Sequence, residues 1–270
     1  MLLQGNCIAD RHCESCSFRE ECVVQQIYYH SLKIVPDFVQ GKESLGYLYE
    51  CSDTRTRFEE GDELRFQILL FGNVIVHFPV ILQAMYRLGM FGLGRENAVF
   101  RLVQIENQRG EKILQQDNVY LNHLKPDTLS DYVKKRYFQL PTPTEMRFVT
   151  PLAQKHEGRF LTSFQEDALV DSIYRRIYLL NCMEGNQMER WCPFRGSLQI
   201  ESQTVQEAKI PRYSGTQDKI IYLSGIEGKL QIKVKEEFLP YLLVGELTHI
   251  GKNTSMGFGK YVLRKTGNKG

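Results

Sequence analysis

Two stretches of this chain, one in each half, repeat the same order of helix, glycine-rich loop and strand. In the first half a helix near Pro79 precedes residues 91–95 (FGLGR), and in the second a helix near Pro240 precedes residues 256–260 (MGFGK). The loops are offset by 165 residues (257 − 92) and the prolines by 161 (240 − 79). Because element order and loop chemistry both repeat, the chain is predicted to contain two related halves.

The second half is predicted to form a complete α+β domain. A capping box, Ser163-x-x-Glu166, is expected to open a helix that runs to about Leu180, and a second helix is expected at residues 236–246. The expected strands share short apolar runs: residues 145–154, 196–205, 219–224, 229–235 and 258–264. Residues 219–224 and 229–235 read as a hairpin that turns at residues 225–228. We interpret the order as β-α-β-β-α-β, the ferredoxin-like unit.

The first half shows only the later part of that order. The expected elements are strands at residues 47–51, 64–71 and 98–105, with a helix at 78–88 that is capped by Gly89. Residues 1–46 give no convincing strand, so the first domain is predicted to be incomplete at its N-terminus. A basic helix is expected at 127–137, and the run Pro141-Thr142-Pro143 reads as a linker. We therefore predict domains at residues 1–140 and 141–270.

Composition excludes several classes of protein. Hydrophobic residues make up 42% of the chain and charged residues 24%, which argues against a disordered, collagen-like or coiled-coil chain. The net charge is only +2, so any nucleic-acid site must be a local patch. The N-terminus has no basic start and no long apolar run, and polar residues, glycine and proline interrupt the apolar stretch 68–86. We expect no signal peptide, no membrane span and a cytoplasmic location.

Four of the seven cysteines fall within the first 22 residues. Cys7, Cys13, Cys16 and Cys22 have the spacing C-x5-C-x2-C-x5-C. Four thiolates at short spacing can hold a structural Zn²⁺, although only the central C-x2-C matches the usual spacing of zinc knuckles. An iron–sulfur cluster and small buried cysteines without metal remain the alternatives.

Several motifs of this chain resemble those of a known family. They are Gly61-Asp62-Glu63-Leu64 leading to Leu70-Phe71-Gly72, Leu88-Gly89 leading to residues 92–95, Arg212-Tyr213-Ser214-x-x-Gln217, and residues 245–252 (GELTHIGK) closing on 257–261 (GFGKY). From about Cys7 to Arg264 the chain resembles the pre-crRNA-processing endoribonucleases of CRISPR systems, which are members of the RAMP superfamily.

The resemblance implies two tandem ferredoxin-like (βαββαβ) domains that bind CRISPR repeat RNA and cleave pre-crRNA. It implies cleavage without a metal cofactor: the ribose 2′-OH attacks its own phosphate and leaves a 2′,3′-cyclic phosphate and a 5′-OH. Other CRISPR effector or adaptation proteins are expected partners, a membrane is not, and a homodimer is left open. One alternative is a non-cleaving RAMP subunit that holds crRNA. Another is an unrelated zinc-stabilised nucleic-acid-binding protein centred on the cysteines.

Three residues are candidates for the chemistry. His249 is the first choice, because it follows a predicted helix and precedes a loop rich in glycine and lysine. His30 is the second, since it lies where other branches of the resembled family carry a catalytic histidine. Tyr213 could orient the nucleophile or stack on a base. The alternatives are a helix-capping role for His249, a surface histidine at 30 and a packed tyrosine at 213.

The predicted RNA-binding residues lie in two segments. Five basic residues and one acidic residue occur from Glu246 onward, which is a suitable patch for phosphates. The glycines permit close backbone approach, and their N–H groups are expected to cradle a phosphate; the alternative is a tight helix-to-strand turn. The predicted RNA contacts are Arg212, Ser214, Gln217, Gly251, Lys252, Gly257, Gly259 and Lys260.

Overall fold

The computed structural model describes residues 13, 15–28, 32–39, 45–55, 57–93, 96–214 and 219–266. The chain divides into two compact units. The first unit comprises Met1–Ser31, Val39–Gly46 and Phe71–Thr128, and the second comprises Leu32–Phe38, Tyr47–Leu70 and Leu129–Gly270. The boundary at 140/141 that the sequence suggests falls inside the second unit, and residues 47–70 belong to that unit as well.

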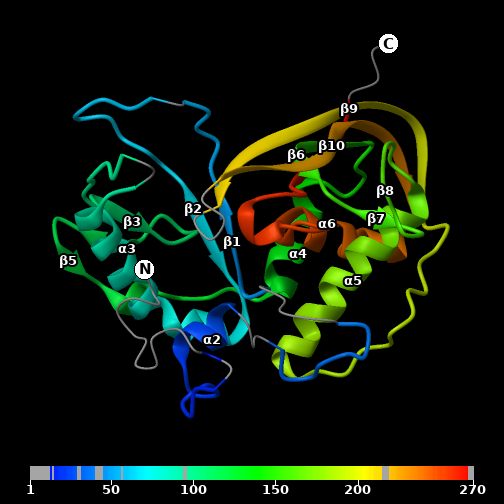
Figure 1. Cartoon of the computed structure of the whole chain (residues 1–270). Helices are drawn as coiled ribbons and strands as arrows, with labels where there is room; N and C mark the ends of the chain where they lie inside the picture. Colours follow the sequence, from blue (N-terminus) through cyan, green and yellow to red (C-terminus); the bar gives the residue numbers. More distant parts are fainter. Residues whose placement is uncertain are drawn as a thin grey trace. The chain divides into compact units, whose positions relative to one another are not determined.

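A four-stranded antiparallel sheet with two helices forms the centre of the second unit (Figure 1). Its elements in chain order are β6 (Glu145–Leu152), α5 (Glu166–Glu184), β9 (Leu198–Ser214), β10 (Lys219–Val234), α6 (Leu239–Thr248) and β11 (Tyr261–Arg264). The strands lie in the order β11-β6-β10-β9. This half therefore has the β-α-β-β-α-β order that the sequence indicates.

The alternation of buried and exposed side chains along β6 shows which face of the sheet packs against the core of the second unit. In β6 the side chains of Met146 and Phe148 are buried while Arg147 and Val149 are exposed, as expected for a strand with one covered face. Ile173 of α5 and Leu242 of α6 have no exposed surface and belong to the same apolar cluster. The two helices thus cover the inner face of the sheet.

Shorter elements complete the second unit. They are β1 (Tyr47–Glu50), β2 (Gln67–Leu70), α4 (Leu129–Gln139), β7 (Lys155–His156), β8 (Arg159–Phe160), and the 3₁₀ turns η3 (Glu236–Phe238) and η4 (Thr254–Met256). Strands β1 and β2 pair antiparallel. Helix α4 is held to α6 by a bidentate ion pair in which the Arg136 guanidinium donates to both carboxylate oxygens of Glu246 at 2.8 and 2.9 Å.

The first unit contains a helix and a small sheet. Its elements are α2 (Val23–Tyr28), η1 (Gly72–His77), α3 (Phe78–Phe91), β3 (Gln104–Glu106), β4 (Lys112–Gln115), β5 (Asn118–Val119) and η2 (Leu121–His123). The sheet order is β3-β4-β5. Because β1 and β2 belong to the other unit, the described residues of the first unit do not form a βαββαβ domain, and the tandem arrangement stays a prediction.

The hairpin predicted around residues 225–228 is wrong. Strand β10 runs without a break from Lys219 to Val234, and its antiparallel partner is the equally long β9. Gly225 and Gly228 lie inside the strand because neighbouring backbone approaches them closely. A Cβ at Gly225 would lie 2.8 Å from the carbonyl oxygen of Leu152. Glycine here marks a close strand contact rather than a turn.

Three boundary predictions in the helices and strands also change. Gly89 lies inside α3, which ends at the positive-φ residue Gly92. Helix α5 has Gln165 at its N-cap, and Glu166 accepts a hydrogen bond from the backbone N–H of Ile200 instead of closing a capping box. The strand expected at residues 98–105 is reduced to an isolated bridge at Ala98 and the short β3.

One helical segment of the described residues is apolar and long enough to cross a membrane by length and composition. It spans Gly72–Phe91, has a mean hydropathy of 1.4 in its most apolar window and is 17% buried there. Core helices of soluble proteins and signal sequences have the same properties, so this feature assigns no membrane role by itself.

Candidate nucleic-acid interface

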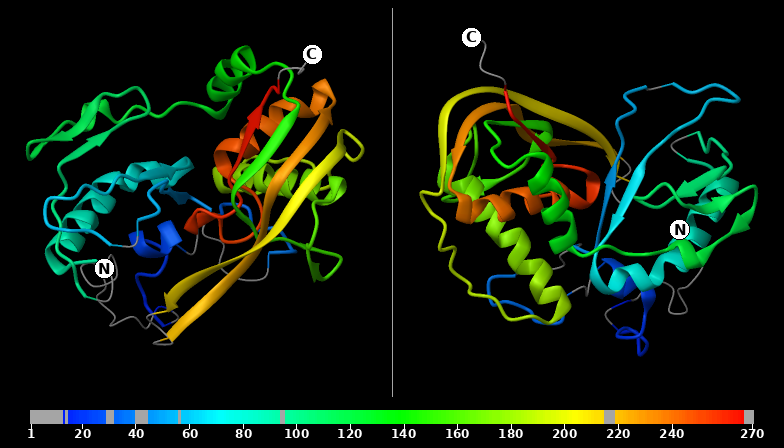
Figure 2. Two further views of the ribbon diagram at one scale, coloured as in Figure 1. Left: turned by 90° about the horizontal axis from the view of Figure 1, so that it is seen from above. Right: turned by 180° about the vertical axis from the view of Figure 1, so that it is seen from behind.

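The longest exposed feature of the second unit is a two-stranded ribbon. We use this name for residues 208–214 of β9 paired with 219–225 of β10, which extend beyond the part of β10 that pairs with β6 (Figure 2). On it the side chains of Ile220 and Tyr222 are 60% and 66% exposed. Its exposed basic residues are Lys209, Arg212 and Lys219. Exposed aromatic and basic side chains together suit single-stranded nucleic acid, whose bases stack and whose phosphates need cations.

The glycine-rich loop, residues 249–260, lies beside the base of the ribbon. The end of β6 connects them: Gly225 contacts Leu152, and the backbone N–H of Gly259 donates to the carbonyl of Pro151 at 2.9 Å. Ala153 also forms a bridge with Lys252. The base of the ribbon and the glycine-rich loop, far apart in sequence, therefore meet at one end of the sheet, while Arg212 lies four residues farther out along the ribbon.

Most backbone N–H groups of the glycine-rich loop are used within the protein. Those of residues 250–252 and 256–260 donate to protein oxygens; for example, Gly251 donates to the Ser172 hydroxyl at 3.0 Å and Lys260 to the Thr150 hydroxyl at 2.9 Å. A phosphate cradle built from these groups is thus not available in this conformation. The exposed side chain of Lys252 is what the loop presents to a phosphate.

The loop glycines are required by protein packing. Gly257 and Gly259 have φ values of +85° and +72°, which residues other than glycine rarely adopt. A Cβ at Gly257 would lie 2.7 Å from the carbonyl oxygen of Tyr49, and one at Gly259 would overlap the carbonyl oxygen of Ile250. The observed geometry therefore matches the tight helix-to-strand turn named as the alternative for this loop.

His249 is fully buried, with 0% of its side chain exposed. Its Nδ1 lies 3.1 Å from the carbonyl oxygen of Phe258, and its Nε2 lies 2.9 Å from Oε1 of Glu50. A general base must reach the proton that it removes, directly or through one water. In this conformation the ring instead links the start of the loop to its end and to β1.

Glu50 is the last residue of strand β1, and its carboxylate has two hydrogen-bond partners. Its second oxygen, Oε2, accepts a hydrogen bond from the Lys260 ammonium. Burial raises the pKa of Glu50, but the hydrogen bonds and charges of His249 and Lys260 outweigh burial and lower the pKa below its ordinary value. Lys260, predicted to bind RNA, is therefore directed at a carboxylate.

The remaining predicted site residues lie either on the ribbon or outside the described residues. Arg212 lies exposed on the ribbon, and Tyr213 and Ser214 are at the end of β9, where the structure describes only their backbone. His30 and Gln217 lie outside the described residues. Their roles stay predictions.

One basic hairpin next to the loop was missed by sequence reasoning. Strands β7 and β8 follow directly after Ala153, the bridge partner of Lys252. The hairpin carries Lys155, His156 and exposed Arg159, and the Lys155 ammonium lies 5.0 Å from the centre of the Phe160 ring. The run KHEGRF, in which Lys155, His156 and Arg159 surround a glycine turn, was the available signal.

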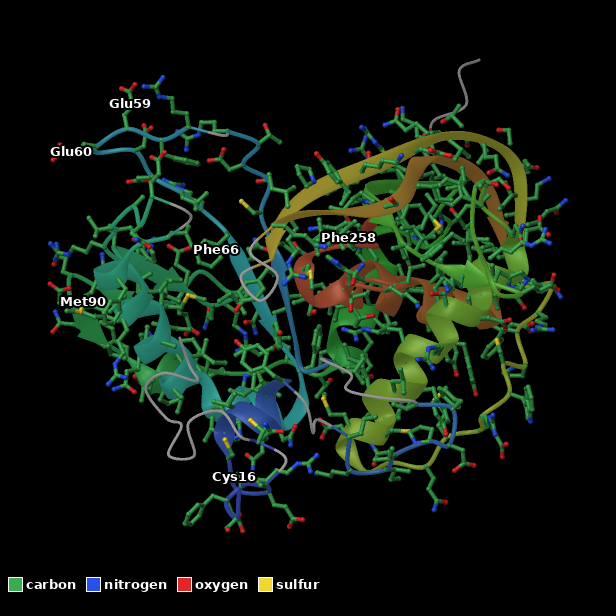
Figure 3. The ribbon with its side chains drawn as sticks, in the orientation of Figure 1. Cys16, Glu59, Glu60, Phe66, Met90 and Phe258 are labelled. Atoms are coloured by element: carbon green, nitrogen blue, oxygen red, sulfur yellow. The ribbon has the colours of Figure 1, made fainter. Side chains whose placement is uncertain are left out.

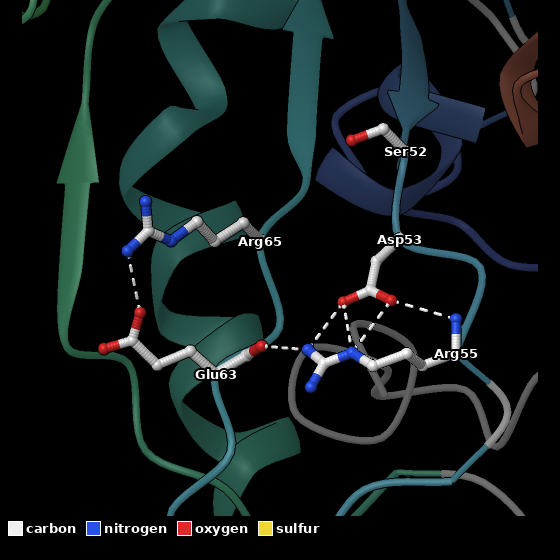
Figure 4. Close-up of a pocket in the computed structure, with 5 residues that line it drawn as sticks. All are labelled: Ser52, Asp53, Arg55, Glu63 and Arg65. Carbon is white, nitrogen blue, oxygen red and sulfur yellow. Dashed lines mark hydrogen bonds and ion pairs between the residues drawn. The ribbon is translucent and has the colours of Figure 1, made fainter.

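A polar cavity of about 470 Å³ in the loop between β1 and β2 is a weaker candidate (Figure 4). It is lined by Ser52, Asp53, Arg55, Glu63 and Arg65. Its arginines are already neutralised: Arg55 pairs with Asp53 at 2.7 Å and Arg65 with Glu63 at 2.9 Å. These pairs leave little unbalanced charge for a phosphate.

The cysteine segment is described only in part. Cys13, Cys16 and Cys22 are free thiols of intermediate exposure (Cys16 is labelled in Figure 3), and Cys7 lies outside the described residues. Within the described part of the chain, no group of three or more His, Cys, Asp or Glu side chains is arranged to hold a metal. The thiols present suit zinc chemically but do not converge here, so the zinc site stays a prediction.

The fold and loop define a class of α+β protein in which a ferredoxin-like domain ends in helix, glycine-rich loop and strand. Within that class, residues 146–261 match the family model described as CRISPR-associated endoribonuclease Cas6. The second unit therefore carries a Cas6-family domain, which confirms the resemblance to CRISPR repeat-processing proteins. Residues 1–128 match another model, described as an N-terminal domain. A comparison with curated proteins gave no match.

Solved structures share this fold. A partial Cas6-RT-Cas1–Cas2 complex and a Cas6-RT-Cas1–Cas2 complex each match with a TM-score of 0.57 and 15% identity over 83% of this chain. This chain spans only 39% and 24% of the length of those two chains. A Cas6 product complex matches with a TM-score of 0.48 and 14% identity, covering 85% of this chain and 84% of its own.

Proposed function

We propose that this chain binds CRISPR repeat RNA through the ribbon and the glycine-rich loop and cleaves pre-crRNA. The match of residues 146–261 to the Cas6 family model supports the proposal at the level of the family. The observation that carries the proposal for this chain is the meeting of the ribbon, Lys252 and the β7–β8 hairpin at one end of the sheet. Basic side chains there would contact phosphates, and Tyr222 would stack on a base.

The cleavage step uses the RNA's own nucleophile. The 2′-OH gives its proton to a general base and its oxygen attacks the adjacent phosphorus; the P–O5′ bond breaks, and the 5′-oxygen takes a proton from a general acid. The products are a 2′,3′-cyclic phosphate and a 5′-OH, and no metal takes part. Catalytic roles are proposed for His30 and Tyr213. For His249 the buried geometry favours a positioning role, since both ring nitrogens already face oxygen atoms of the protein.

The second candidate function is binding of crRNA without cleavage, as a subunit of a larger CRISPR assembly. The burial of His249, the first-choice catalytic residue, is the observation that favours it. Other CRISPR proteins are proposed partners in this case. Both functions use the same RNA-binding interface, so RNA binding alone cannot distinguish them. A cleavage assay can.

The test is a cleavage assay with purified protein, RNA carrying the host's CRISPR repeat, and excess EDTA. A second substrate has a 2′-deoxy sugar at the cut site. The proposal predicts cleavage of the first substrate and no cleavage of the second. Tight binding without cleavage would favour the non-cleaving subunit, and absence of both binding and cleavage would contradict the proposed function.

A further inference from the structure

A single carboxylate connects both ends of the glycine-rich loop. Glu50 contributes one oxygen to His249, the first residue of the loop, and the other to Lys260, the last. The partners lie 199 and 210 residues away in sequence. The loop ends are also joined by the hydrogen bond from the Ile250 N–H to the Gly259 carbonyl at 3.1 Å. Strand β1 therefore holds the loop closed at its base.

Both nitrogens of the His249 ring face oxygen atoms of the protein. Nδ1 faces the Phe258 carbonyl, which can only accept, so Nδ1 must carry a proton. Nε2 faces a carboxylate oxygen of Glu50, and Glu50 also accepts from Lys260. Both contacts are satisfied together when both ring nitrogens are protonated, which is the imidazolium form. An imidazolium, a carboxylate and an ammonium then alternate in charge at the base of the loop.

Other charged groups around Glu50 are consistent with this arrangement. Tyr132 of α4 has its pKa raised to about 12, mainly by burial and the Glu246 carboxylate, with a smaller part from Glu50 itself. Tyr132 therefore stays neutral at physiological pH and adds no further negative charge beside Glu50. Glu246 is itself paired with Arg136. The side-chain hydrogen-bond partners of Glu50 are thus His249 and Lys260.

We propose that Glu50 is a positioning residue: it holds His249 as a buried imidazolium and ties both ends of the glycine-rich loop, so that Lys252 is presented to RNA phosphate. This inference rests on the proposed function for the RNA-binding part only. A pure charge effect and a positioning role predict opposite changes in RNA affinity when Glu50 is removed. Removal of an acidic residue beside a phosphate site strengthens RNA binding if charge alone matters. If Glu50 positions the loop, its removal weakens binding.

The test compares Glu50→Gln with Glu60→Gln, which makes the same change of charge at the exposed tip of the β1–β2 loop (Figure 3). The first readout needs no RNA. In the free protein, amide hydrogen exchange of Ile250 and Gly259 should accelerate in Glu50→Gln alone. Nitrogen NMR of the His249 ring should show two nitrogen-bound protons in wild type and in Glu60→Gln, and one in Glu50→Gln. Unchanged exchange and an unchanged ring would overturn the proposal.

The second readout is affinity for repeat RNA. Glu50→Gln should bind about tenfold more weakly, since a hydrogen bond to a charged group contributes enough to change an equilibrium constant by that factor. Glu60→Gln should bind as wild type does. Equal or tighter binding by Glu50→Gln would overturn the positioning role. Wild-type protein that binds no repeat RNA would contradict the proposed function, and the exchange and NMR readouts would still decide whether Glu50 closes the loop.

A second variant covers the case in which Glu50→Gln does not fold. Lys260→Met removes the other charge of the cluster and keeps a side chain of similar length. It should accelerate exchange of the same two amides. Where both single variants fold, the effect of the double variant on loop exchange should be smaller than the sum of the single effects, because the residues share one interaction. Additive effects would contradict the shared contact.

Discussion

The carboxylate of Glu50 decides what His249 can do. A buried imidazole with two protein partners is held in place, whereas a catalytic imidazole must meet the substrate. The sequence identified His249 as important because it lies between a helix and a glycine-rich loop, and that position is correct. It could not show the partner, because Glu50 lies 199 residues away and forms part of an unremarkable strand.

The lowered pKa of Glu50 predicts an acid-dependent loss of stability. Its pKa in the folded protein lies below the ordinary 4.5, so the unfolded chain takes up the proton first as the pH falls. The stabilisation is therefore complete above about pH 4.5 and is lost as the pH falls through the folded-state pKa. The difference in free energy of unfolding between wild type and Glu50→Gln should shrink below pH 4.5. A constant difference from pH 7 to pH 3 would contradict the ion pairs.

Lys252 is the loop residue that is expected to contact phosphate. Lys252→Ala should weaken repeat-RNA binding and lower the slope of log K against log salt by about one, the effect of losing a single phosphate contact. Lys233→Ala is a matched control, because the Lys233 ammonium is already paired with Glu201. An unchanged slope for Lys252→Ala would place the phosphate contacts elsewhere.

Among the elements, the ribbon and the loop are predicted to work as one interface. The periodicity of apolar residues gave helices α5 and α6 and strand β6 nearly at their observed positions. The ribbon was not predicted at its full length, since Gly225 and Gly228 look like a turn in sequence. Only the backbone of β6 beside Gly225 and of β9 beside Gly228 shows that they are close-contact sites inside a strand. Local patterns cannot supply such a neighbour.

Tyr222 tests the ribbon directly. Its side chain is 66% exposed, so Tyr222→Ala should change the free energy of unfolding by less than about 0.5 kcal/mol. RNA affinity should fall by about 1–3 kcal/mol, the usual effect of losing one base–aromatic stack. Trp191→Ala is the control, because Trp191 is also exposed, at 78%, and lies on a different loop of the same unit. Equal effects of both variants on affinity would argue against a specific role for the ribbon.

At the scale of the whole molecule, the second unit contains the complete β-α-β-β-α-β order, and the described residues of the first unit do not. The internal repeat in the sequence predicted two equivalent halves. In the structure, residues 47–70 join the second unit, where β1 supplies Glu50 to the loop. The repeat of glycine-rich loops alone therefore does not establish a repeat of domains, and the tandem arrangement stays a prediction. Similar loop sequences indicate a similar local backbone geometry. They do not determine which unit a strand joins, because that depends on long-range contacts.

The cysteine segment gives a separate prediction for the first unit. If Cys7, Cys13, Cys16 and Cys22 hold zinc, purified protein should contain about one equivalent of Zn²⁺, and chelation should lower the thermal stability. Cleavage of RNA at a temperature where the chelated protein stays folded should continue, because the proposed chemistry uses no metal. Protein without zinc, and with unchanged melting in chelator, would contradict a structural metal site.

Photocrosslinking of repeat RNA to the wild-type protein, with the crosslinked peptides identified by mass spectrometry, tests the central claim most directly. The measurement reports which surface touches RNA, whether or not the RNA is cleaved. The proposed interface predicts crosslinks within residues 208–225, 251–256 and 154–161. Crosslinks confined to other parts of the chain, such as α3 or the β1–β2 loop, would contradict it.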